Sequence, residues 1–501
     1  MTRTSAPTPG IVPAESGTET VSRLVAAAAG AARQWGRTLP AERAAALRAV
    51  AELLAGSADE LIEIAARESH LPVARLTGEL GRTTFQLRFL AEVIEEGSFL
   101  EAIIDTPDPA HPIGPRPDLR RMMLPLGPVA MFAASNFPFA FSVAGGDTAA
   151  ALAAGCPVVV KAHPGHPELS ARTGSLVAQA LSAAGAPDGV FSVVYGMQAG
   201  IDLLQDERIT AAAFTGSISG GRTLADIAAA RPTPIPFYGE LGSINPAYVT
   251  AAAVAARGQS IAEGFVASFT LGVGQFCTKP GVLFLPAGSG LEGAITAAAE
   301  QVGSAPMLAG RLAEQHGELL AALSRVPGVR TLATGAGDGL AWSPTVLATH
   351  ASTLLEHPAE LLGECFGPTS LLVEYDDAEQ LQAMTALVPG SLTATVHAEP
   401  EESAALAPLL EQLAGMAGRV LWNGWPTGVA VSWAQHHGGP YPATTVPGHT
   451  SVGSTSIRRF QRPVCYQSIP AELLPVPLLD SNELGIPRRV NGVLTWNDVD
   501  G

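Results

Sequence analysis

The chain contains 501 residues, 47% hydrophobic and 15% charged, so it can bury a large core and is not a disordered protein. Lys and Arg number 29 against 46 Asp and Glu, and this net charge of −17 argues against binding to nucleic acid or anionic membranes. No apolar run of about 18 residues predicts a membrane span, and the N-terminal residues lack the apolar core of a signal peptide. We therefore expect a soluble, cytoplasmic protein of two or three domains.

The N-terminal part is expected to be helical. After a Pro/Thr/Ser-rich arm of about 20 residues, alanine-rich segments predict helices at 18–35 and 40–55, and Pro40 suits the first turn of the second. Residues 57–60 (SADE) fit a capping box, which starts another helix at Ser57. Residues 106–118 hold five prolines and should form an extended connector or arm.

From about residue 126 short apolar runs alternate with helix-length segments, which favours right-handed βαβ units and a parallel, doubly wound sheet typical of dinucleotide binding. The expected strands are 129–134, 157–161, 190–195 and 211–215, and the expected helices are about 142–154, 168–184 and 217–230. A second mixed region follows to about 440, and the strand-like tail from 455 suits an oligomerisation arm.

Two glycine motifs compete for a dinucleotide. Residues 288–293 (GSGLEG) fit GxGxxG after an apolar run, but Glu292 would repel a pyrophosphate and no series of βαβ units surrounds them, so an ordinary surface turn is favoured. Residues 214–217 (FTGS) end a strand inside the alternating block and open a helix whose free N–H groups suit a phosphate, although Ser217 could simply be an N-cap. Lys161 ends another strand, where such sheets bind ligands, with a solvated lysine as the alternative.

Three residues are candidates for chemistry. Cys277 lies in a glycine-rich segment (272–278) that permits an exposed thiolate, with a small core residue as the alternative. Glu240, between a strand and a glycine, suits a general base, with a surface glutamate as the alternative. Asn136 follows the first strand of the block and could donate to an oxyanion, with a turn residue as the alternative.

The other cysteines and the paired histidines receive no functional assignment. Cys156, Cys365 and Cys465 lie among apolar residues and are expected in the core. The four cysteines show no spacing of a disulfide scaffold or zinc site. Because neighbouring residues of a strand point to opposite faces, 436–437 (HH) should not share an ion, and we expect no metal.

Taken in chain order, seven such elements resemble the aldehyde dehydrogenase superfamily over nearly the whole chain. They are NFP (136–138), Lys161, FTGS with Gly221 (214–221), ELG (240–242), GQFC (274–277), PTV (344–346) and ECFGP (364–368). The resemblance implies an α/β fold with a Rossmann-type cofactor domain (1–105 and 126–242), an α/β catalytic domain (243–454) and oligomerisation arms (106–125 and 455–501).

The resemblance also implies roles for site residues. Cys277 would be the nucleophile, Glu240 the general base and Asn136 an oxyanion donor. The residues implied in binding the cofactor are Lys161, His163, Pro164, Gly216, Ser217, Gly221, Glu364 and Phe366. Together they imply that an aldehyde is oxidised to a carboxylic acid through a thiohemiacetal and a thioester, with NAD or NADP as the oxidant.

The finer resemblance is to 2,5-dioxovalerate (α-ketoglutarate semialdehyde) dehydrogenases and to NADP-preferring fatty-aldehyde dehydrogenases, carried by residues 144–164 and 438–444. Many relatives have Trp where this chain has Ser135, so the substrate channel should differ. Many NAD-preferring relatives carry K-P-x-E where this chain has KAHP (161–164), and without that carboxylate NADP should be accepted and favoured. His163 and His166 would add to this preference if they were protonated.

Substrate and rival functions remain open at this point. A semialdehyde carboxylate would need a cation, for which Lys279, Arg82 and Arg88 are candidates, each with a solvated-surface alternative. A fatty aldehyde is the other substrate class. A cysteine hydrolase would need a histidine near the thiol, and none lies close to GQFC in the sequence, while a non-catalytic protein would tolerate loss of Cys277. We expect a homodimer or homotetramer.

Overall fold

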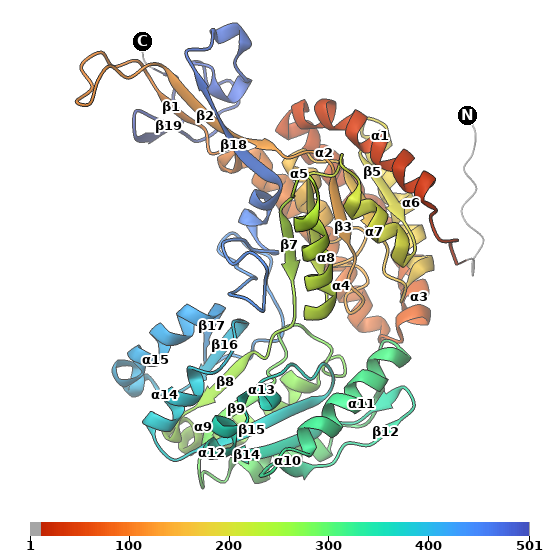
Figure 1. Cartoon of the computed structure of the whole chain (residues 1–501), viewed down its shortest axis with the longest axis vertical. Helices are drawn as coiled ribbons and strands as arrows, with labels where there is room; N and C mark the ends of the chain where they lie inside the picture. Colours follow the sequence, from red (N-terminus) through yellow and green to blue (C-terminus); the bar gives the residue numbers. More distant parts are fainter. Residues whose placement is uncertain (1–11, 500–501) are drawn as a thin grey trace.

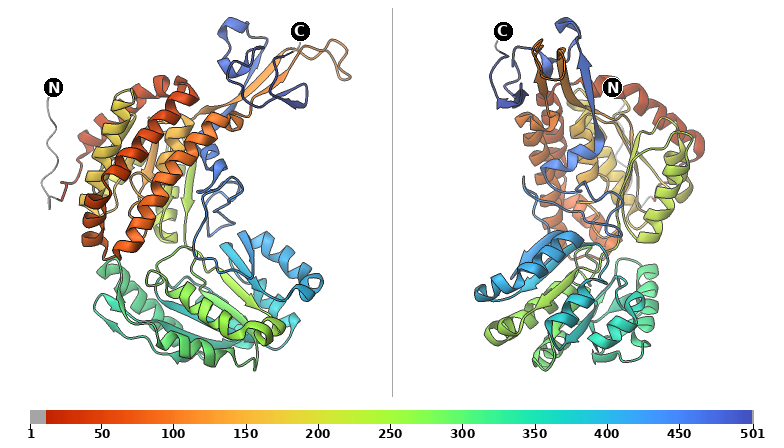
Figure 2. Two further views of the ribbon diagram at one scale, coloured as in Figure 1. Left: turned by 180° about the vertical axis from the view of Figure 1, so that it is seen from behind. Right: turned by 60° about the vertical axis from the view of Figure 1, so that its left-hand side comes forward.

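The computed structural model describes residues 12–499, which form two parallel sheets with their helices and an arm that projects from the first sheet's side of the molecule (Figures 1 and 2). Residues 1–11 of the expected N-terminal arm lie outside the described residues. No helix within residues 12–499 is both long and apolar enough to cross a membrane.

The first sheet is parallel throughout, with strand order β5-β4-β3-β6-β7. Its strands are β3 (Val129–Phe132), β4 (Val158–Lys161), β5 (Phe191–Val194), β6 (Ala211–Thr215) and β7 (Phe237–Glu240). The four expected strands are confirmed. The strand order reverses between β3 and β6, and ligands of doubly wound sheets bind at the carboxyl ends of the strands beside such a point.

Helices cover both faces of this sheet, and they include those expected near 18, 40, 142, 168 and 217. They are α1 (Thr18–Arg37), α2 (Pro40–Gly56), α3 (Ala58–Ser69), α4 (Val73–Glu96), η1 (Ser98–Leu100), α5 (Gly146–Ala154), α6 (Pro167–Ala183), α7 (Met197–Gln205) and α8 (Ile218–Ala230). The short helix α7 was not expected. The largest cluster of buried side chains joins α2, α4, α5 and α6 to the sheet.

The capping box expected at Ser57 does not form. Helix α3 does begin at Ala58, but the Ser57 side chain makes no cap hydrogen bond. Ser57 also ends α2, and its backbone (φ −107°, ψ 18°) is not the extended conformation of a capping serine. Ser57 alone joins the two helices, and as the C-cap of α2 it does not adopt the extended backbone that would let its side chain cap α3.

The second sheet has the order β11-β14-β15-β9-β8-β16-β17 and is parallel except for β11. Its strands are β8 (Pro246–Val249), β9 (Val282–Pro286), β11 (Arg330–Ala333), β14 (Thr345–His350), β15 (Thr369–Tyr375), β16 (Ser391–His397) and β17 (Ala417–Trp422). Its helices are α9 (Ala251–Thr270), α10 (Leu291–Glu300), α11 (Gly310–Ser324), α12 (Ala351–Glu356), α13 (Pro358–Leu361), α14 (Ala378–Thr385), η2 (Pro400–Glu402) and α15 (Ser403–Met416). A small sheet of β10 (Ala305–Pro306), β13 (Ala341–Trp342) and β12 (Gly337–Asp338) lies beside it. Of residues 288–293, the first three lie in the turn after β9 and the last three begin α10, beside the second sheet.

The arm is a separate sheet with the order β18-β2-β1-β19-β20. Its strands are β1 (Ile103–Asp105), β2 (Leu119–Pro125), β18 (Gln461–Gln467), β19 (Arg488–Val490) and β20 (Val493–Thr495), accompanied by η4 (Ala471–Leu473) and η5 (Val476–Leu478). The proline-rich connector closes on itself through backbone hydrogen bonds between Asp108 and Arg116. The placement of Cys465 in the core was wrong, because it lies exposed on β18, an edge strand.

A long irregular segment, residues 423–453, returns from the second sheet to the first and positions part of the site. Its residues Ala443–Thr445 run along the edge of β7, where Leu241 N–H donates to Ala443 O (2.8 Å) and Thr445 N–H to Gly239 O (3.0 Å). The segment leads into η3 (Ser454–Phe460), whose Arg459 forms a buried ion pair of 2.7 Å with Asp147 on α5.

This ion pair should matter for stability. Asp147→Asn leaves the buried Arg459 charge unpaired, and we expect unfolding free energy to fall by about 3–5 kcal/mol. Urea-induced unfolding followed by tryptophan fluorescence measures the change. Arg222→Ala is the matched control, because its pair with Asp226 is exposed (52% and 67%) and should contribute less than about 1 kcal/mol. Equal effects of the two substitutions would contradict the prediction.

Candidate active site

Cys277 follows a left-handed turn after α9. Gly272, Val273 and Gly274 all have positive φ (57°, 58° and 66°), a strained conformation for the β-branched valine. A Cβ on Gly274 would lie 2.1 Å from the carbonyl oxygen of Gly367, so only glycine fits there. The GQFC and ECFGP segments are thus in direct contact, and this turn presents the thiol at the surface of a cavity.

Asn245 fixes the backbone of the nucleophile loop from the second sheet. This buried residue has φ +53°, and its side-chain amide donates to the carbonyl oxygens of Cys277 (2.8 Å) and Lys279 (2.9 Å). Its carbonyl oxygen accepts from the Ser243 hydroxyl (2.7 Å) and the Thr393 N–H (3.2 Å). Sequence analysis missed Asn245, because a single asparagine before a proline carries no pattern that marks it.

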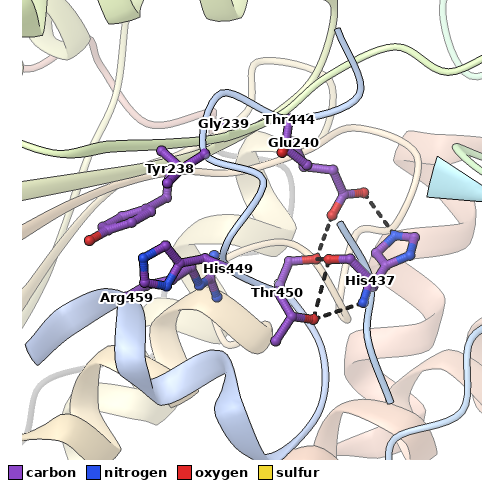
Figure 3. A pocket seen from close by; sticks show the side chains of 10 residues that line it. Tyr238, Gly239, Glu240, His437, Thr444, His449, Thr450 and Arg459 are labelled. Atoms are coloured by element: carbon purple, nitrogen blue, oxygen red, sulfur yellow. Dashed lines mark hydrogen bonds and ion pairs between the residues drawn. The ribbon is translucent and has the colours of Figure 1, made fainter. Parts of the chain in front are cut away.

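Glu240 and Cys277 are brought together with a histidine from the returning segment. His437 Nε2 lies 2.9 Å from Glu240 Oε1 and 3.6 Å from Cys277 Sγ. The Ser451 hydroxyl donates to the other carboxylate oxygen of Glu240 (2.5 Å). His437 itself is held by its backbone N–H, which donates to Thr450 Oγ1 (2.8 Å; Figure 3). Because a carboxylate only accepts, we assign the Nε2 hydrogen of His437 to the bond with Glu240.

The sequence has no histidine close to GQFC, but the fold brings His437 Nε2 to 3.6 Å from the Cys277 sulfur. Histidine 437 lies 160 residues from Cys277 along the chain, and only the return of segment 423–453 to β7 brings the two together. The metal argument from residues 436–437 considered only whether the two histidines could share an ion. His437 instead meets side chains of other elements, Glu240 at the end of β7 and Cys277 after α9.

The surroundings of this cluster shift the pKa values of its two acidic groups, Glu240 and Cys277, in opposite directions. Burial alone would raise the pKa of Glu240, but contact with His437 and the Ser451 hydroxyl outweighs it and leaves the pKa below its usual value. Burial raises the pKa of the Cys277 thiol well above its ordinary value, and the charges of Glu240 and Glu364 raise it further. At neutral pH the geometry therefore holds a carboxylate beside a protonated thiol.

A cavity of about 20 Å³ lies beside Glu240, lined by Tyr238, His449 and Arg459 among others (Figure 3). This volume is enough for about one water molecule. His449 is only half-buried, so the cavity links the buried carboxylate to the surface of the returning segment.

A larger cavity of about 200 Å³ opens on the other side of the thiol. Its lining includes Arg75, Gly78, Glu79, Arg82, Phe137, Phe141, Phe276, Cys277, Thr278, Gly428, Val429 and His437. The Arg75 guanidinium stacks on Phe137 and Phe276, at 5.3 and 4.7 Å from the ring centres. Both arginines come from α4. The sequence analysis named Arg82 and Arg88 of this helix as candidate cations and missed Arg75.

The guanidinium groups of Arg75 and Arg82 in this cavity have N–H donors that meet no acceptor within residues 12–499. Arg75 Nη2 donates to the Asn136 carbonyl oxygen (2.7 Å), and Arg82 donates to the Val429 carbonyl. The remaining nitrogens of both (Nε and Nη1 of Arg75, Nε and Nη2 of Arg82) are buried and have no hydrogen-bond partner within residues 12–499. Glu79 accepts from the backbone N–H groups of Phe139 and Ala140, and burial raises its pKa to about 7, so it does not cancel both positive charges.

The other two cation candidates do not face this cavity. Lys279 is buried beneath the nucleophile loop, where its Nζ donates to the carbonyl oxygens of Cys365 (2.6 Å) and Thr369 (2.7 Å). Arg88 lies on the outer face of α4 and pairs with Glu52 at 2.9 Å. Of the three candidates, only Arg82 lines the cavity that contains the thiol.

Asn136 lies beside the nucleophile loop. Its side-chain Nδ2 donates to the Gln275 carbonyl oxygen at 3.1 Å, two residues before Cys277. The loop that carries Asn136 follows β3, at the point where the strand order of the first sheet reverses.

The carboxyl edge of the first sheet fits a dinucleotide. Lys161 ends β4 and is buried, its Nζ makes no salt bridge within residues 12–499 and lies 3.7 Å from Met197 Sδ, and burial lowers the pKa of its ammonium group. Gly216 and Ser217 lie exposed at the start of α8, where Ser217 Oγ accepts from Gly220 N–H (3.2 Å). A Cβ on Gly221 would meet Leu241 at 2.1 Å, so this glycine lets α8 pack close to the sheet. A lysine beside a free helix N-terminus suits a pyrophosphate.

The histidines after Lys161 do not supply positive charge. Burial, together with the nearby His166 and Lys161, lowers the pKa of His163 to about 3. His166 is fully buried, with Nε2 on the Ala134 carbonyl oxygen (3.0 Å) and Nδ1 on the Ser170 hydroxyl (3.2 Å). The idea that protonated His163 and His166 attract a phosphate therefore fails at neutral pH, while Pro164 lies exposed nearby.

Glu364 and Phe366 lie between the two sheets. The Glu364 carboxylate reaches within 2.4 Å of the place where a Cβ on Gly242 would be, and burial raises its pKa to about 7. Phe366 is half-buried. Glu364 is thus placed next to the ELG segment that carries Glu240.

The profile of the aldehyde dehydrogenase family matches residues 10–441. The chain belongs to the aldehyde dehydrogenase family. It is 47% identical to alpha-ketoglutaric semialdehyde dehydrogenase 2 of Azospirillum brasilense, over 90% of this chain and 87% of that protein. It is 43% identical to the alpha-ketoglutaric semialdehyde dehydrogenase of Acinetobacter baylyi, over 95% and 92%. Among solved structures, an NAD-dependent aldehyde dehydrogenase from Sinorhizobium meliloti matches with a TM-score of 0.75 and 26% identity, over 91% of this chain and 89% of that one.

Membership of the family confirms the fold class and the type of reaction expected from the sequence. The protein is an aldehyde dehydrogenase that uses NAD(P) to oxidise an aldehyde. A 1-pyrroline-5-carboxylate dehydrogenase from Thermus with bound NAD shares the fold, with a TM-score of 0.75 at 21% identity.

The raised pKa of Cys277 makes its alkylation pH-dependent. Because a raised pKa keeps the thiol protonated at neutral pH, we expect the alkylation rate of Cys277 by iodoacetamide to rise about tenfold per pH unit from pH 6 to 8. Mass spectrometry of the Cys277 peptide measures it. Glu240→Gln removes a neighbouring negative charge and should raise the rate at pH 7 several-fold. A rate that is constant over this range would contradict the prediction.

Proposed function

We propose that this aldehyde dehydrogenase oxidises α-ketoglutarate semialdehyde (2,5-dioxopentanoate) to 2-oxoglutarate. The observation that carries the proposal is the pair of guanidinium groups, Arg75 and Arg82, whose unused buried donors line the cavity of Cys277. Buried arginine donors without a partner are costly unless a ligand meets them, and a carboxylate is their best-matched partner. The two relatives that are 47% and 43% identical carry the name of this activity.

The chemistry proposed for the chain starts at Cys277. Its sulfur attacks the aldehyde carbon to give a thiohemiacetal, while Glu240 accepts the thiol proton. The Nε2 hydrogen of His437 faces both the carboxylate and the sulfur, so it can stabilise whichever is negative. The Asn136 amide and the Cys277 backbone N–H would donate to the oxyanion, and one such donor typically contributes about 3–4 kcal/mol to lowering the barrier.

The second half-reaction uses the same base. The nicotinamide cofactor would supply the hydride acceptor, and the residues we propose to hold it are Lys161, His163, Pro164, Gly216, Ser217, Gly221, Glu364 and Phe366. Glu240 first releases the thiol proton to solvent, and it then deprotonates the water molecule that hydrolyses the thioester, with the Cys277 sulfur as the leaving group. The water-sized cavity behind Glu240, with Ser451 and half-buried His449, supports a route for this proton to solvent.

A fatty aldehyde is the alternative substrate, favoured by the aromatic lining of Phe137, Phe141 and Phe276. It would leave the donors of Arg75 and Arg82 unmatched. The cysteine hydrolase gains a histidine near the thiol, but it explains neither the family membership nor the free lysine and helix terminus at the edge of the first sheet.

The substrate assignment is tested with Arg82→Met. Loss of a charged donor should lower kcat/KM for α-ketoglutarate semialdehyde by about 10- to 100-fold, mainly through KM, and change kcat/KM for hexanal by less than about threefold. Initial rates of nicotinamide reduction measure both. Arg88→Met, on the outer face of the same helix, is the control. An equal loss for both aldehydes would mean that Arg82 serves the fold or the thiol rather than the substrate carboxylate, and a wild-type preference for hexanal would overturn the assignment.

We propose further that NADP is favoured over NAD. The KAHP segment has no carboxylate after Lys161. A carboxylate at that place would repel a 2′-phosphate and would bind the ribose hydroxyls. One other carboxylate does approach this edge. Glu15 packs on Gly196, held by hydrogen bonds between Ser16 and Tyr195 (2.8 and 3.1 Å), and its charge acts on Lys161.

Glu15 should therefore limit the preference for NADP. In Glu15→Gln the loss of a negative charge beside Lys161 is expected to tighten NADP binding relative to NAD by about tenfold. Equilibrium titration of the protein with each dinucleotide, followed by tryptophan quenching, measures the ratio. Glu19→Gln, exposed on the first turn of α1, is the control. An unchanged ratio would show that Glu15 does not face the ribose.

We also propose that the protein is a homodimer or homotetramer and that it is located in the cytoplasm. The projecting arm carries exposed apolar residues on and beside β20 (Val493, Leu494 and Trp496), which supports a homodimer or homotetramer joined through this sheet (Figures 1 and 2). A cytoplasmic location is supported by four cysteines that are all free.

A further inference from the structure

The side chains of the active centre also have the donor set of a metal site. Cys277, His437 and Glu240 each offer one ligand atom, and these atoms all lie within 4.8 Å of one another. No other such group of three occurs within residues 12–499. A thiolate, an imidazole and a carboxylate that leave one position open make a three-ligand zinc site. We propose that these three side chains bind Zn²⁺ and that the bound ion inhibits the enzyme reversibly.

Two of the three distances between ligand atoms are close to those that the ion requires, and the third, between Cys277 Sγ and a Glu240 oxygen, lies within 4.8 Å. With zinc bonds of about 2.3 Å to sulfur and about 2.1 Å to nitrogen and oxygen, tetrahedral ligand atoms lie about 3.4–3.6 Å apart. Cys277 Sγ and His437 Nε2 are already 3.6 Å apart. His437 Nε2 and Glu240 Oε1, at 2.9 Å, must separate by about half an ångström, since the ion replaces the hydrogen between them.

The charges also favour a dication. Without metal, a thiolate at Cys277 would lie within 4.8 Å of the Glu240 carboxylate, and the two negative charges would repel each other. When Zn²⁺ binds, the S–H proton leaves to solvent, a Zn–S bond forms, and His437 binds as neutral imidazole after its Nε2 hydrogen moves to Nδ1. No atom changes oxidation state. The ion neutralises the thiolate and the carboxylate together, and Nδ1, which is buried without a partner in the described part of the chain, carries the hydrogen.

The ion can reach the site by the path of the substrate. Cys277 and His437 both line the cavity of about 200 Å³, so the fourth ligand position faces this space and takes water. Because the nucleophile and the base are both ligands, a bound ion blocks attack on the aldehyde. The inhibition rests on the proposed function of Cys277 and Glu240, whereas the metal binding does not.

Cobalt(II) is the probe for binding, because its thiolate complexes absorb in the near ultraviolet. The full-length protein, freed of metal with EDTA, is titrated with Co²⁺ and then with Zn²⁺. We expect a sulfur-to-cobalt band that saturates at one ion per chain, is displaced by Zn²⁺ and is accompanied by protection of Cys277 from iodoacetamide. We also expect Zn²⁺ to abolish dehydrogenase activity and EDTA to restore it.

Variants assign the ligands. His437→Asn should weaken Zn²⁺ binding by about 100-fold or more, and Cys277→Ser should abolish the band. The controls are His436→Asn, the adjacent histidine, and Cys365→Ser, whose sulfur lies 3.6 Å from His316 elsewhere; both should retain the band. Circular dichroism checks that each variant is folded, and the wild-type titration does not depend on any of them.

The outcomes separate the two proposals. Absence of the band in the wild type, or full affinity in folded His437→Asn, overturns the zinc site whatever the activity. A band with no oxidation of α-ketoglutarate semialdehyde by the EDTA-treated protein leaves the metal site standing and overturns the proposed substrate. Binding at one ion per chain without loss of activity overturns the inhibition.

Discussion

The buried carboxylate of Glu240 is the constraint around which this centre is built. A carboxylate removed from water is costly unless charged or polar groups meet it. Here they come from a single source, the returning segment, which contributes His437 at 2.9 Å and Ser451 at 2.5 Å. Backbone hydrogen bonds between this segment and the edge of β7 fix that contact. The pairing of the β7 edge with the returning segment therefore sets the protonation state of Glu240, the base.

The nucleophile is held by groups from both sheets. From the second sheet, Asn245 binds the carbonyl oxygens on either side of the loop, and Gly367 presses on Gly274 from beneath. From the first sheet, Asn136 reaches Gln275. The strained valine at φ 58° shows that the local sequence does not itself prefer this turn, so these outside contacts must hold it. The reactive sulfur thus occupies a position defined by the junction of the sheets, where a cavity and a cofactor edge meet.

The sequence reveals the strands and motifs that are short runs of residues, and it misses contacts between residues far apart in the chain. The strands of the first sheet and the motifs of Cys277, Glu240 and Lys161 could be found because each is a short run with its own pattern. His437, Ser451 and Asn245 could not, since their roles depend on contacts across 32 to 211 residues. Lys279 was misjudged for a related reason: closeness to Cys277 in the chain says nothing of direction, and two buried carbonyl oxygens hold its ammonium group beneath the loop.

The return of segment 423–453 also affects how the protein is made. A chain emerging from the ribosome exposes all strands of both parallel sheets before residue 437 is available. Until then Glu240 has neither its histidine nor its serine, and the edge of β7 lacks its neighbour. A chain made only as far as residue 436 therefore carries every strand of both sheets but not the complete catalytic centre. The surroundings of the reactive thiol are completed by residues 437 and 451, which follow all of these strands in the chain.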